Sequence, residues 1–241
     1  IDNFINSNEV IKRKNELVFS EFDISLGYLN DIKKKNTVTL VPLTNPDTLS
    51  SSILFRRLKK LINKKYKGTG GAKLPVLIIY SCMKLFCNEV ERYKSCEVKS
   101  LGSHLSPDSR SKSSGDIEIF KDGILFESYE VKLKRKITYH LVNNVIKEKI
   151  YRHNPKRYFV LSSQISAEDK KSINNSIKKI KKEHGCEIII DDPMKLIKRY
   201  INLLEDLEQF LNYLSKIILS DIELKIEHKE EWKKLYENLA T

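Results

Sequence analysis

Apolar and polar residues alternate along two short segments in the middle of the chain, 116–120 and 124–133. Side chains point alternately to the two faces of a strand, so this alternation predicts two half-buried strands. Asp122-Gly123 lies between the segments and favours a tight two-residue turn. The pattern therefore predicts an antiparallel hairpin with one apolar face and one charged face.

On either side of this hairpin, apolar residues recur at helical spacing. The spacing predicts helical pieces within 8–36 and helices over about 50–67, 74–93, 138–152, 166–184, 193–218 and 228–239. Two more strand-like runs, 158–163 and 186–191, flank the helix at 166–184. This order is typical of a right-handed unit in which a helix connects two parallel strands.

Together these elements predict an α/β fold, with a central mixed β-sheet flanked by helices and extra helices at both chain ends. The 241 residues can bury one substantial core, whereas two independent domains would be crowded. We expect a mainly helical region at 1–67, a core at 68–192 and a helical region at 193–241. The last region would pack on the N-terminal helices or on a second copy of the chain.

Basic residues outnumber acidic ones, 44 to 32, which gives a formal net charge of +12. This excess favours a polyanionic partner such as DNA, because phosphate neutralisation releases counterions. The preference for Lys over Arg can also reflect genomic base composition. The expected helix near 50–67 carries Arg56, Arg57 and several lysines, a face that can follow a phosphate backbone or can be simply solvated.

The charged face of the hairpin holds the candidate chemistry. Asp116 lies on the first strand, and Glu130 and Lys132 share a face of the second, so the three groups can converge. Two carboxylates suit Mg²⁺, which keeps waters and binds substrate phosphate as well, and the carbonyl of Val131 offers another oxygen. Lys132 would orient or deprotonate the attacking water and offset phosphate charge.

This arrangement resembles the PD-(D/E)XK nuclease superfamily, whose second motif is here Glu130-Val131-Lys132. A narrower resemblance is to type II restriction endonucleases of the SacI type. It is carried by Gly71–Leu77, Ser103–Ser111, Gly115–Glu118 and the Glu130 tripeptide, and it spans roughly 68–163. The resemblance implies a restriction-endonuclease-like core and Mg²⁺-dependent cleavage of double-stranded DNA that leaves 5′-phosphate and 3′-hydroxyl ends.

The resemblance also implies an accessory carboxylate from the preceding helix, for which Glu89 is the candidate. Palindromic cutters are usually twofold dimers, so a homodimer is expected. A cognate DNA methyltransferase would accompany a restriction role. Gly115 stands where the superfamily motif has Pro, and the Pro-Asp pair of this region is Pro107-Asp108, so Asp108 competes with Asp116 for the first position.

Polar loops next to the hairpin supply candidate DNA contacts, because loops beside a rigid strand often carry recognition. The residues expected to contact DNA are His104, Arg110, Ser111, Lys112, Lys134, Arg135, Arg56 and Arg57.

Other functions are compatible with the same pattern. The hairpin can be an ordinary one with a solvated charged face, which Lys121 and Glu127 would suit, in a non-catalytic DNA-binding module. A nuclease of this fold can also act on branched or damaged DNA in repair or recombination. No apolar run is long enough to cross a bilayer and none is typical of a secretory leader, so we expect a cytoplasmic location and no membrane partner.

Overall fold

The computed structural model describes residues 38–40, 49–101, 113–133 and 135–240. The chain divides into two compact units, Ile1–Thr39 and Leu40–Thr241, and every helix and strand named below belongs to the second unit. The predicted helical pieces within 8–36 lie outside the described residues, as do six of the candidate side chains. These six are His104, Asp108, Arg110, Ser111, Lys112 and Lys134.

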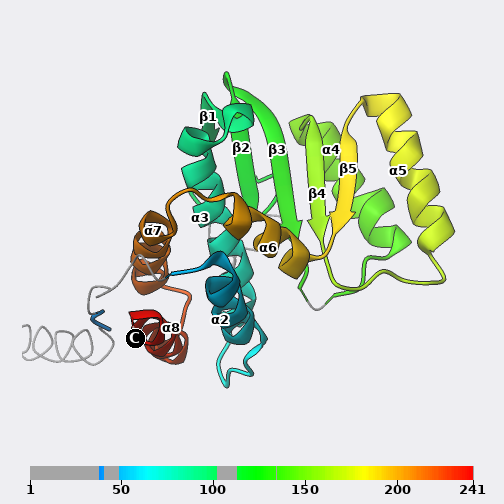
Figure 1. The fold of residues 1–241 in the computed structure, drawn as a ribbon. Coiled ribbons are helices and arrows are strands. Elements are labelled where there is room, and N and C mark those ends of the chain that lie inside the picture. The colour runs from blue at the N-terminus through cyan, green and yellow to red at the C-terminus, as the bar shows by residue number, and fades with distance from the viewer. Residues whose placement is uncertain (1–37, 41–48, 102–112, 134, 241) are drawn as a thin grey trace, which may run out of the picture. The chain divides into compact units, whose positions relative to one another are not determined.

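A five-stranded mixed sheet forms the centre of the second unit (Figure 1). Its strands are β1 (Cys96–Val98), β2 (Ile117–Lys121), β3 (Ile124–Val131), β4 (Arg157–Leu161) and β5 (Glu187–Asp191). They lie in sequence order across the sheet, with β1, β2 and β3 antiparallel and β3, β4 and β5 parallel. The predicted hairpin and the predicted pair of parallel strands are therefore both confirmed, and β1 is a strand that the sequence pattern did not indicate.

The turn of the hairpin has the geometry that its sequence favours. Asp122 and Gly123 both have positive φ, 52° and 76°. A two-residue hairpin turn of this kind needs left-handed backbone at both positions, which Asp tolerates and Gly adopts without strain. The turn aligns Lys121 with Ile124.

Helices cover both faces of the sheet. On one side lie α2 (Ser51–Asn63), α3 (Leu74–Glu89), α6 (Pro193–Leu203), α7 (Leu207–Ser220) and α8 (Ile226–Ala240). On the other side lie the π-helical turn η4 (Leu141–Ile146), α4 (Lys147–His153) and α5 (Lys170–His184). Short 3₁₀ turns, η2 (Gly71–Lys73) and η3 (Glu91–Tyr93), flank α3.

Two hydrophobic cores result from this arrangement. The larger core joins Ile117, Tyr129 and Phe159 of the sheet to α2, α3, α6, α7 and α8. The smaller core joins Tyr158 and Val160 to η4, α4 and α5. The larger core includes residues on both sides of the expected boundaries at 67/68 and 192/193.

The helix predicted over 193–218 is wrong as a single element, because the structure has two helices there, α6 and α7. Leu204 leaves the helical conformation with φ −70° and ψ 132°, and its side chain is buried. Two residues later, the carboxylate of Asp206 accepts a hydrogen bond from the backbone N–H of Gln209 and caps α7. The apolar spacing continues across this break, so the periodicity alone concealed it.

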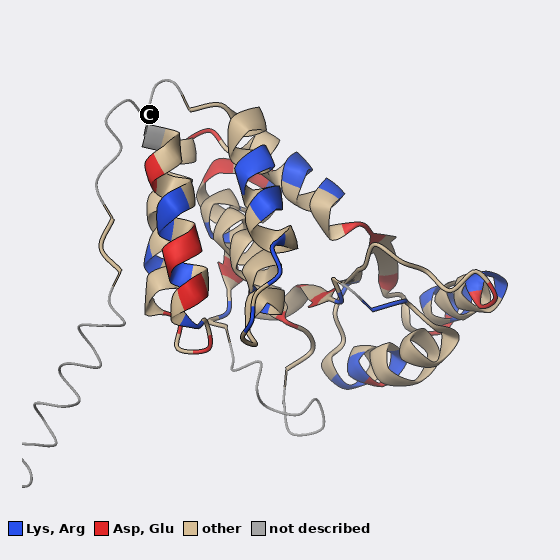
Figure 2. Cartoon of the chain, turned by 90° about the horizontal axis from the view of Figure 1, so that it is seen from below, with Lys and Arg blue, Asp and Glu red and all other residues tan. Residues whose placement is uncertain are grey.

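Lysine and arginine lie on helices of both layers, as Figure 2 shows from the end of the sheet where β3 stops. Helix α8 carries both signs of charge, whereas α5 has six exposed lysines: Lys170, Lys171, Lys178, Lys179, Lys181 and Lys182. Among the described residues, no helix is both long and apolar enough to span a membrane.

Candidate functional site

A β-bulge in the hairpin decides which face each acid occupies. Next to the turn, Lys121 pairs with Ile124 and Phe120 with Leu125, but further along Ile119 pairs with Glu127. Phe126 is thus an extra residue on β3 that has no partner residue on β2. The register beyond it, with Ile117 opposite Tyr129, puts Asp116 opposite Glu130. Opposed residues of antiparallel strands share a face, so the bulge places both acids on the α4 side of the sheet.

Gly115 allows the two strands to approach closely at this point. A Cβ atom on Gly115 would lie 2.5 Å from the carbonyl oxygen of Tyr129, which is too short for any side chain. The backbone N–H of Asp116 donates to that same carbonyl at 2.7 Å. The superfamily motif has Pro at this position, and the structure shows that only Gly fits here.

The carboxylate of Asp116, in place of a backbone carbonyl, accepts a hydrogen bond from the backbone of β3. Its Oδ2 accepts a hydrogen bond of 2.7 Å from the N–H of Val131, the residue between Glu130 and Lys132. Asp116 is half-buried. The structure therefore brings Asp116, Glu130 and Lys132 together at the end of β3.

Glu130 is almost fully buried and lies between two ammonium groups. Lys132 contacts its Oε1 at 2.5 Å, and Lys149 from α4 contacts its Oε2 at 3.0 Å. The backbone holds Lys132 in place as well, because its N–H donates to Leu161 of β4 at 2.7 Å. A buried carboxylate needs such compensation, and two charge-assisted contacts provide it.

A series of hydrogen bonds connects Glu130 to a third acid, Glu118. The hydroxyl of Tyr158 lies 2.6 Å from the carbonyl oxygen of Ser114 and 3.3 Å from Glu130 Oε2. The N–H of Ser114 donates to Glu118 Oε1 at 2.6 Å, and Lys99 contacts the other oxygen of Glu118 at 2.6 Å. Ser114 and Glu118 are buried, so these contacts fix the backbone that leads into Asp116.

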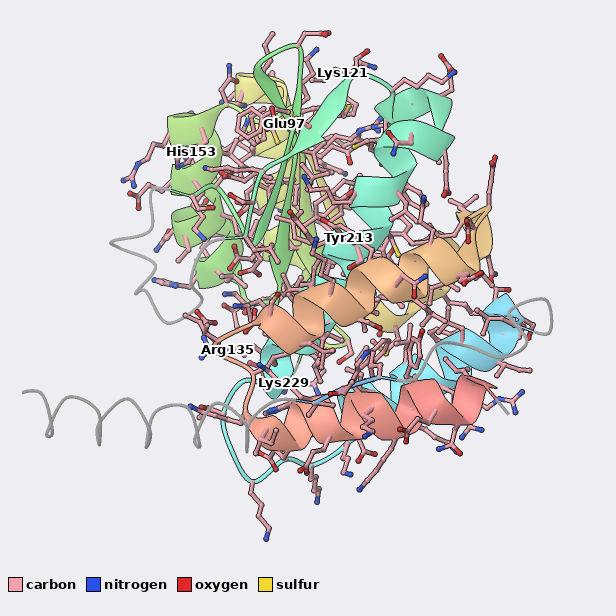
Figure 3. All side chains as sticks on the ribbon, turned by 90° about the vertical axis from the view of Figure 1, so that its left-hand side faces the viewer. Glu97, Lys121, Arg135, His153, Tyr213 and Lys229 are labelled. Carbon is pink, nitrogen blue, oxygen red and sulfur yellow. The ribbon has the colours of Figure 1, made fainter. Side chains whose placement is uncertain are left out.

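His153, at the C-terminal end of α4, lies on the same side of the sheet (Figure 3). Burial lowers the pKa of His153, and the nearby charges of Arg152, Lys99 and Lys149 act in the same direction. The carboxylate of Glu118 opposes this shift. His153 is therefore favoured as the neutral imidazole near neutral pH.

The structure does not bring Glu89 to this group. Its carboxylate accepts a hydrogen bond from the N–H of Glu205 at 3.1 Å, next to the start of α7. Helix α3, which carries Glu89, packs on the face of the sheet opposite to Glu130. An accessory role for Glu89 in this copy of the chain is therefore not supported by its position.

The described DNA-contact candidates lie in two places. Arg135 is exposed, and its N–H donates to the carbonyl of Lys132, so it follows the site directly (Figure 3). Arg56 is exposed and Arg57 half-buried on α2, which belongs to the opposite helical layer. Only Arg135 is thus adjacent to the acids, and the DNA contacts of all three stay predictions.

Sequence reasoning missed Lys149 and Tyr158, although each leaves a signal. Val142, Ile146 and Ile150 form the buried stripe of the helix after the hairpin, and Lys149 falls on that stripe at helical spacing. A lysine on a core-facing stripe requires a buried partner. Tyr158 lies two residues before the buried Val160 and therefore on the same face of β4. A buried hydroxyl at this position also needs a hydrogen-bond partner.

The residues present fit a hard divalent cation in their donor chemistry. Asp116 and Glu130 offer carboxylate oxygens from neighbouring strands, and Mg²⁺ is commonly held by one or two carboxylates with waters and phosphate completing its shell. Across the described part of the chain, no three His, Cys, Asp or Glu side chains gather into a complete protein cage. This small donor set suits an ion shared with a substrate phosphate.

No protein-family model matches this sequence, and no curated protein matches it.

Proposed function

We propose that this protein is a Mg²⁺-dependent endonuclease that hydrolyses phosphodiester bonds of double-stranded DNA, on a restriction-endonuclease-like core. The observation that carries the proposal is the grouping of Asp116, Glu130 and Lys132 at the end of one hairpin. Asp116 contacts the N–H of Val131, and Lys132 contacts Glu130 at 2.5 Å. The resemblance to the PD-(D/E)XK superfamily assigns the same three residues.

Each of these residues has a separate task. Asp116 and Glu130 would hold the metal, with the carbonyl of Val131 as a further oxygen ligand. When bound, the metal supplies Lewis acidity to the scissile phosphate and to a coordinated water. The ammonium of Lys132 lies next to Glu130, one of the proposed metal ligands. From this position Lys132 orients the attacking water and offsets the charge that develops on the phosphate.

The reaction adds one water across one phosphodiester. The water oxygen bonds to phosphorus while the bond between phosphorus and the 3′ oxygen breaks. One proton of the water ends on the 3′ oxygen and the other stays with the new phosphate monoester. The products are a 5′-phosphate and a 3′-hydroxyl, as the resemblance implies.

The charge of the chain supports DNA as the substrate. The net charge is +12, and the exposed lysines of α5 flank the same face of the sheet as Glu130. Exposed ammonium groups release counterions from DNA and give sequence-independent affinity. We propose cleavage at defined sequences by a homodimer, because cutting both strands of a palindrome requires two copies of the site.

Plasmid digestion tests the proposal. The wild-type protein should cut in Mg²⁺ and not in EDTA, and Asp116→Asn, Glu130→Gln and Lys132→Met should each reduce the rate at least about 100-fold. Glu89→Gln is the matched control, because it removes an acid on the opposite face, and it should retain the wild-type rate. Equal activity of Lys132→Met and wild type would refute the proposed mechanism.

The products on linear duplex DNA separate site-specific cleavage from repair. A fixed set of fragments supports recognition of a defined sequence. Cutting confined to junctions or flaps would instead assign the protein to the repair of branched DNA.

A further inference from the structure

Each oxygen of the Glu130 carboxylate contacts a different lysine. The side chains of Lys132 and Lys149 are both mostly buried, 17% and 15% exposed, and they contact separate oxygens of the same carboxylate. Lys132 belongs to the motif, whereas Lys149 comes from α4, in the helical layer above it. Both oxygens of Glu130 are therefore occupied by ammonium groups, and one of the two comes from outside the motif.

Burial of the charged Lys149 side chain costs folding free energy, which is expected where the charge has a function. Lys149 lies on the core-facing stripe of its helix, beside Ile146 and Ile150, both fully buried. An apolar residue at such a position usually stabilises a fold as well as or better than a buried ion pair. The hydroxyl of Tyr158 also lies 3.3 Å from the oxygen that Lys149 contacts. Lys149 is therefore poised over one of the two proposed metal-ligand side chains.

We propose that Lys149 is a positioning residue that competes with the divalent cation for Glu130, and that DNA phosphate releases Glu130 by giving Lys149 a new partner. This inference rests on the proposed function. A carboxylate oxygen that accepts a hydrogen bond from an ammonium group is less available as a metal ligand. Two nearby ammonium groups also repel an incoming cation. A phosphate in the site reverses both effects, since it pairs with the displaced ammonium.

The consequence is reciprocal coupling between metal and DNA. If phosphate strengthens cation binding, the cation must strengthen phosphate binding by the same factor. Without DNA, both oxygens of Glu130 stay paired with lysines, and the site binds the metal weakly. Lys149 thereby limits metal binding to the complex in which cleavage can follow.

Isothermal titration with Mn²⁺ alone, in the absence of DNA, tests this competition. Lys149→Gln should bind Mn²⁺ about tenfold more tightly than wild type, since one charge-assisted contact to Glu130 is lost. Lys149→Arg keeps the charge and should remain near the wild-type affinity. Lys147→Gln, on the same helix with its ammonium over the ring of Tyr151, is the matched control and should also match wild type.

Cleavage of plasmid DNA at saturating Mg²⁺ supplies the second measurement. Lys149→Gln should cut more slowly even though it binds the metal more tightly. These opposite changes identify the competition, because a merely structural defect weakens both metal binding and cleavage. Lys149→Met continues the apolar stripe of the helix and provides a second neutral variant if the Gln variant does not fold.

The outcomes separate the two proposals. If wild type binds Mn²⁺ no better than Asp116→Ala and never cuts DNA, the proposed function fails. If wild type binds and cuts while both neutral variants at position 149 bind Mn²⁺ equally or more weakly, only the competition is refuted.

Discussion

Replacing Gly115 by Ala tests whether the close approach of the two strands positions Asp116. The added Cβ would lie 2.5 Å from the carbonyl oxygen of Tyr129, whereas ordinary contact begins at 3.4 Å, so the strands must separate by about 0.9 Å. The atom it meets is backbone, in a strand that pairs on both sides. Gly115 and its neighbours must therefore move.

The movement has two costs. It lengthens the 2.7 Å bond from the N–H of Asp116 to Tyr129 beyond hydrogen-bonding distance. Loss of this bond and the local strain should lower the free energy of unfolding by about 2 kcal/mol. The carboxylate of Asp116 shifts with its backbone, and a displacement of about 1 Å in a catalytic site reduces the rate about 100-fold.

Urea unfolding and initial rates of plasmid cleavage measure the two effects. Gly123→Ala is the matched control, because its φ of 76° strains a side chain while no atom lies within 4 Å of the new Cβ. It should lose about 1 kcal/mol of stability, as expected for left-handed backbone, and keep the wild-type rate. A Gly115→Ala protein that cuts as fast as Gly123→Ala would refute the claim that this contact positions the acid.

Two further predictions concern buried ionisable groups away from the acids. Lys73 is buried between Asp221 at 2.7 Å and Glu223 at 3.0 Å, so Lys73→Met should lower the free energy of unfolding by about 3 to 5 kcal/mol in urea titrations. A loss as small as that of Lys64→Met, whose ion pair is exposed, would contradict this reading. Burial lowers the pKa of His228, so its contribution to stability is complete above its ordinary pKa and declines as the pH falls below it. Urea unfolding between pH 7.5 and 5.5 should show a smaller loss for His228→Phe than for wild type, and equal losses would exclude His228 as the cause.

The sequence predicted much of the sheet because strong local signals determine it. Asp122-Gly123 has few alternatives to a hairpin turn, and the helix between β4 and β5 ends at Gly185 in the left-handed conformation that glycine favours. These signals need no knowledge of distant residues. The break at Leu204 escaped detection because both α6 and α7 keep the same apolar spacing.

The details of the site depend on contacts that a pattern does not contain. Glu127 would suit a solvated face, yet it is fully buried and contacts Arg92, Tyr93 and Tyr129 on the α3 side of the sheet. Alternation along β3 puts Glu127 on the same face as Tyr129, but it does not reveal that α3 buries this face. Lys149 meets Glu130 only through the packing of α4 on the sheet, which is a tertiary event.

The extra residue on β3 makes the number of residues in the hairpin as important as their identities. If Phe126 were paired in a regular ladder instead of forming a bulge, Asp116 would pair with Tyr129 and point away from Glu130. Substitutions along this ribbon can therefore be absorbed, whereas one residue added between the bulge and Glu130 would send the two acids to opposite sides. Loss of the bulge residue would instead leave Asp116 opposite Glu130 in a regular ladder. Natural variation in this segment should accordingly occur by exchange of side chains or by loss of the bulge, and not by addition of a single residue.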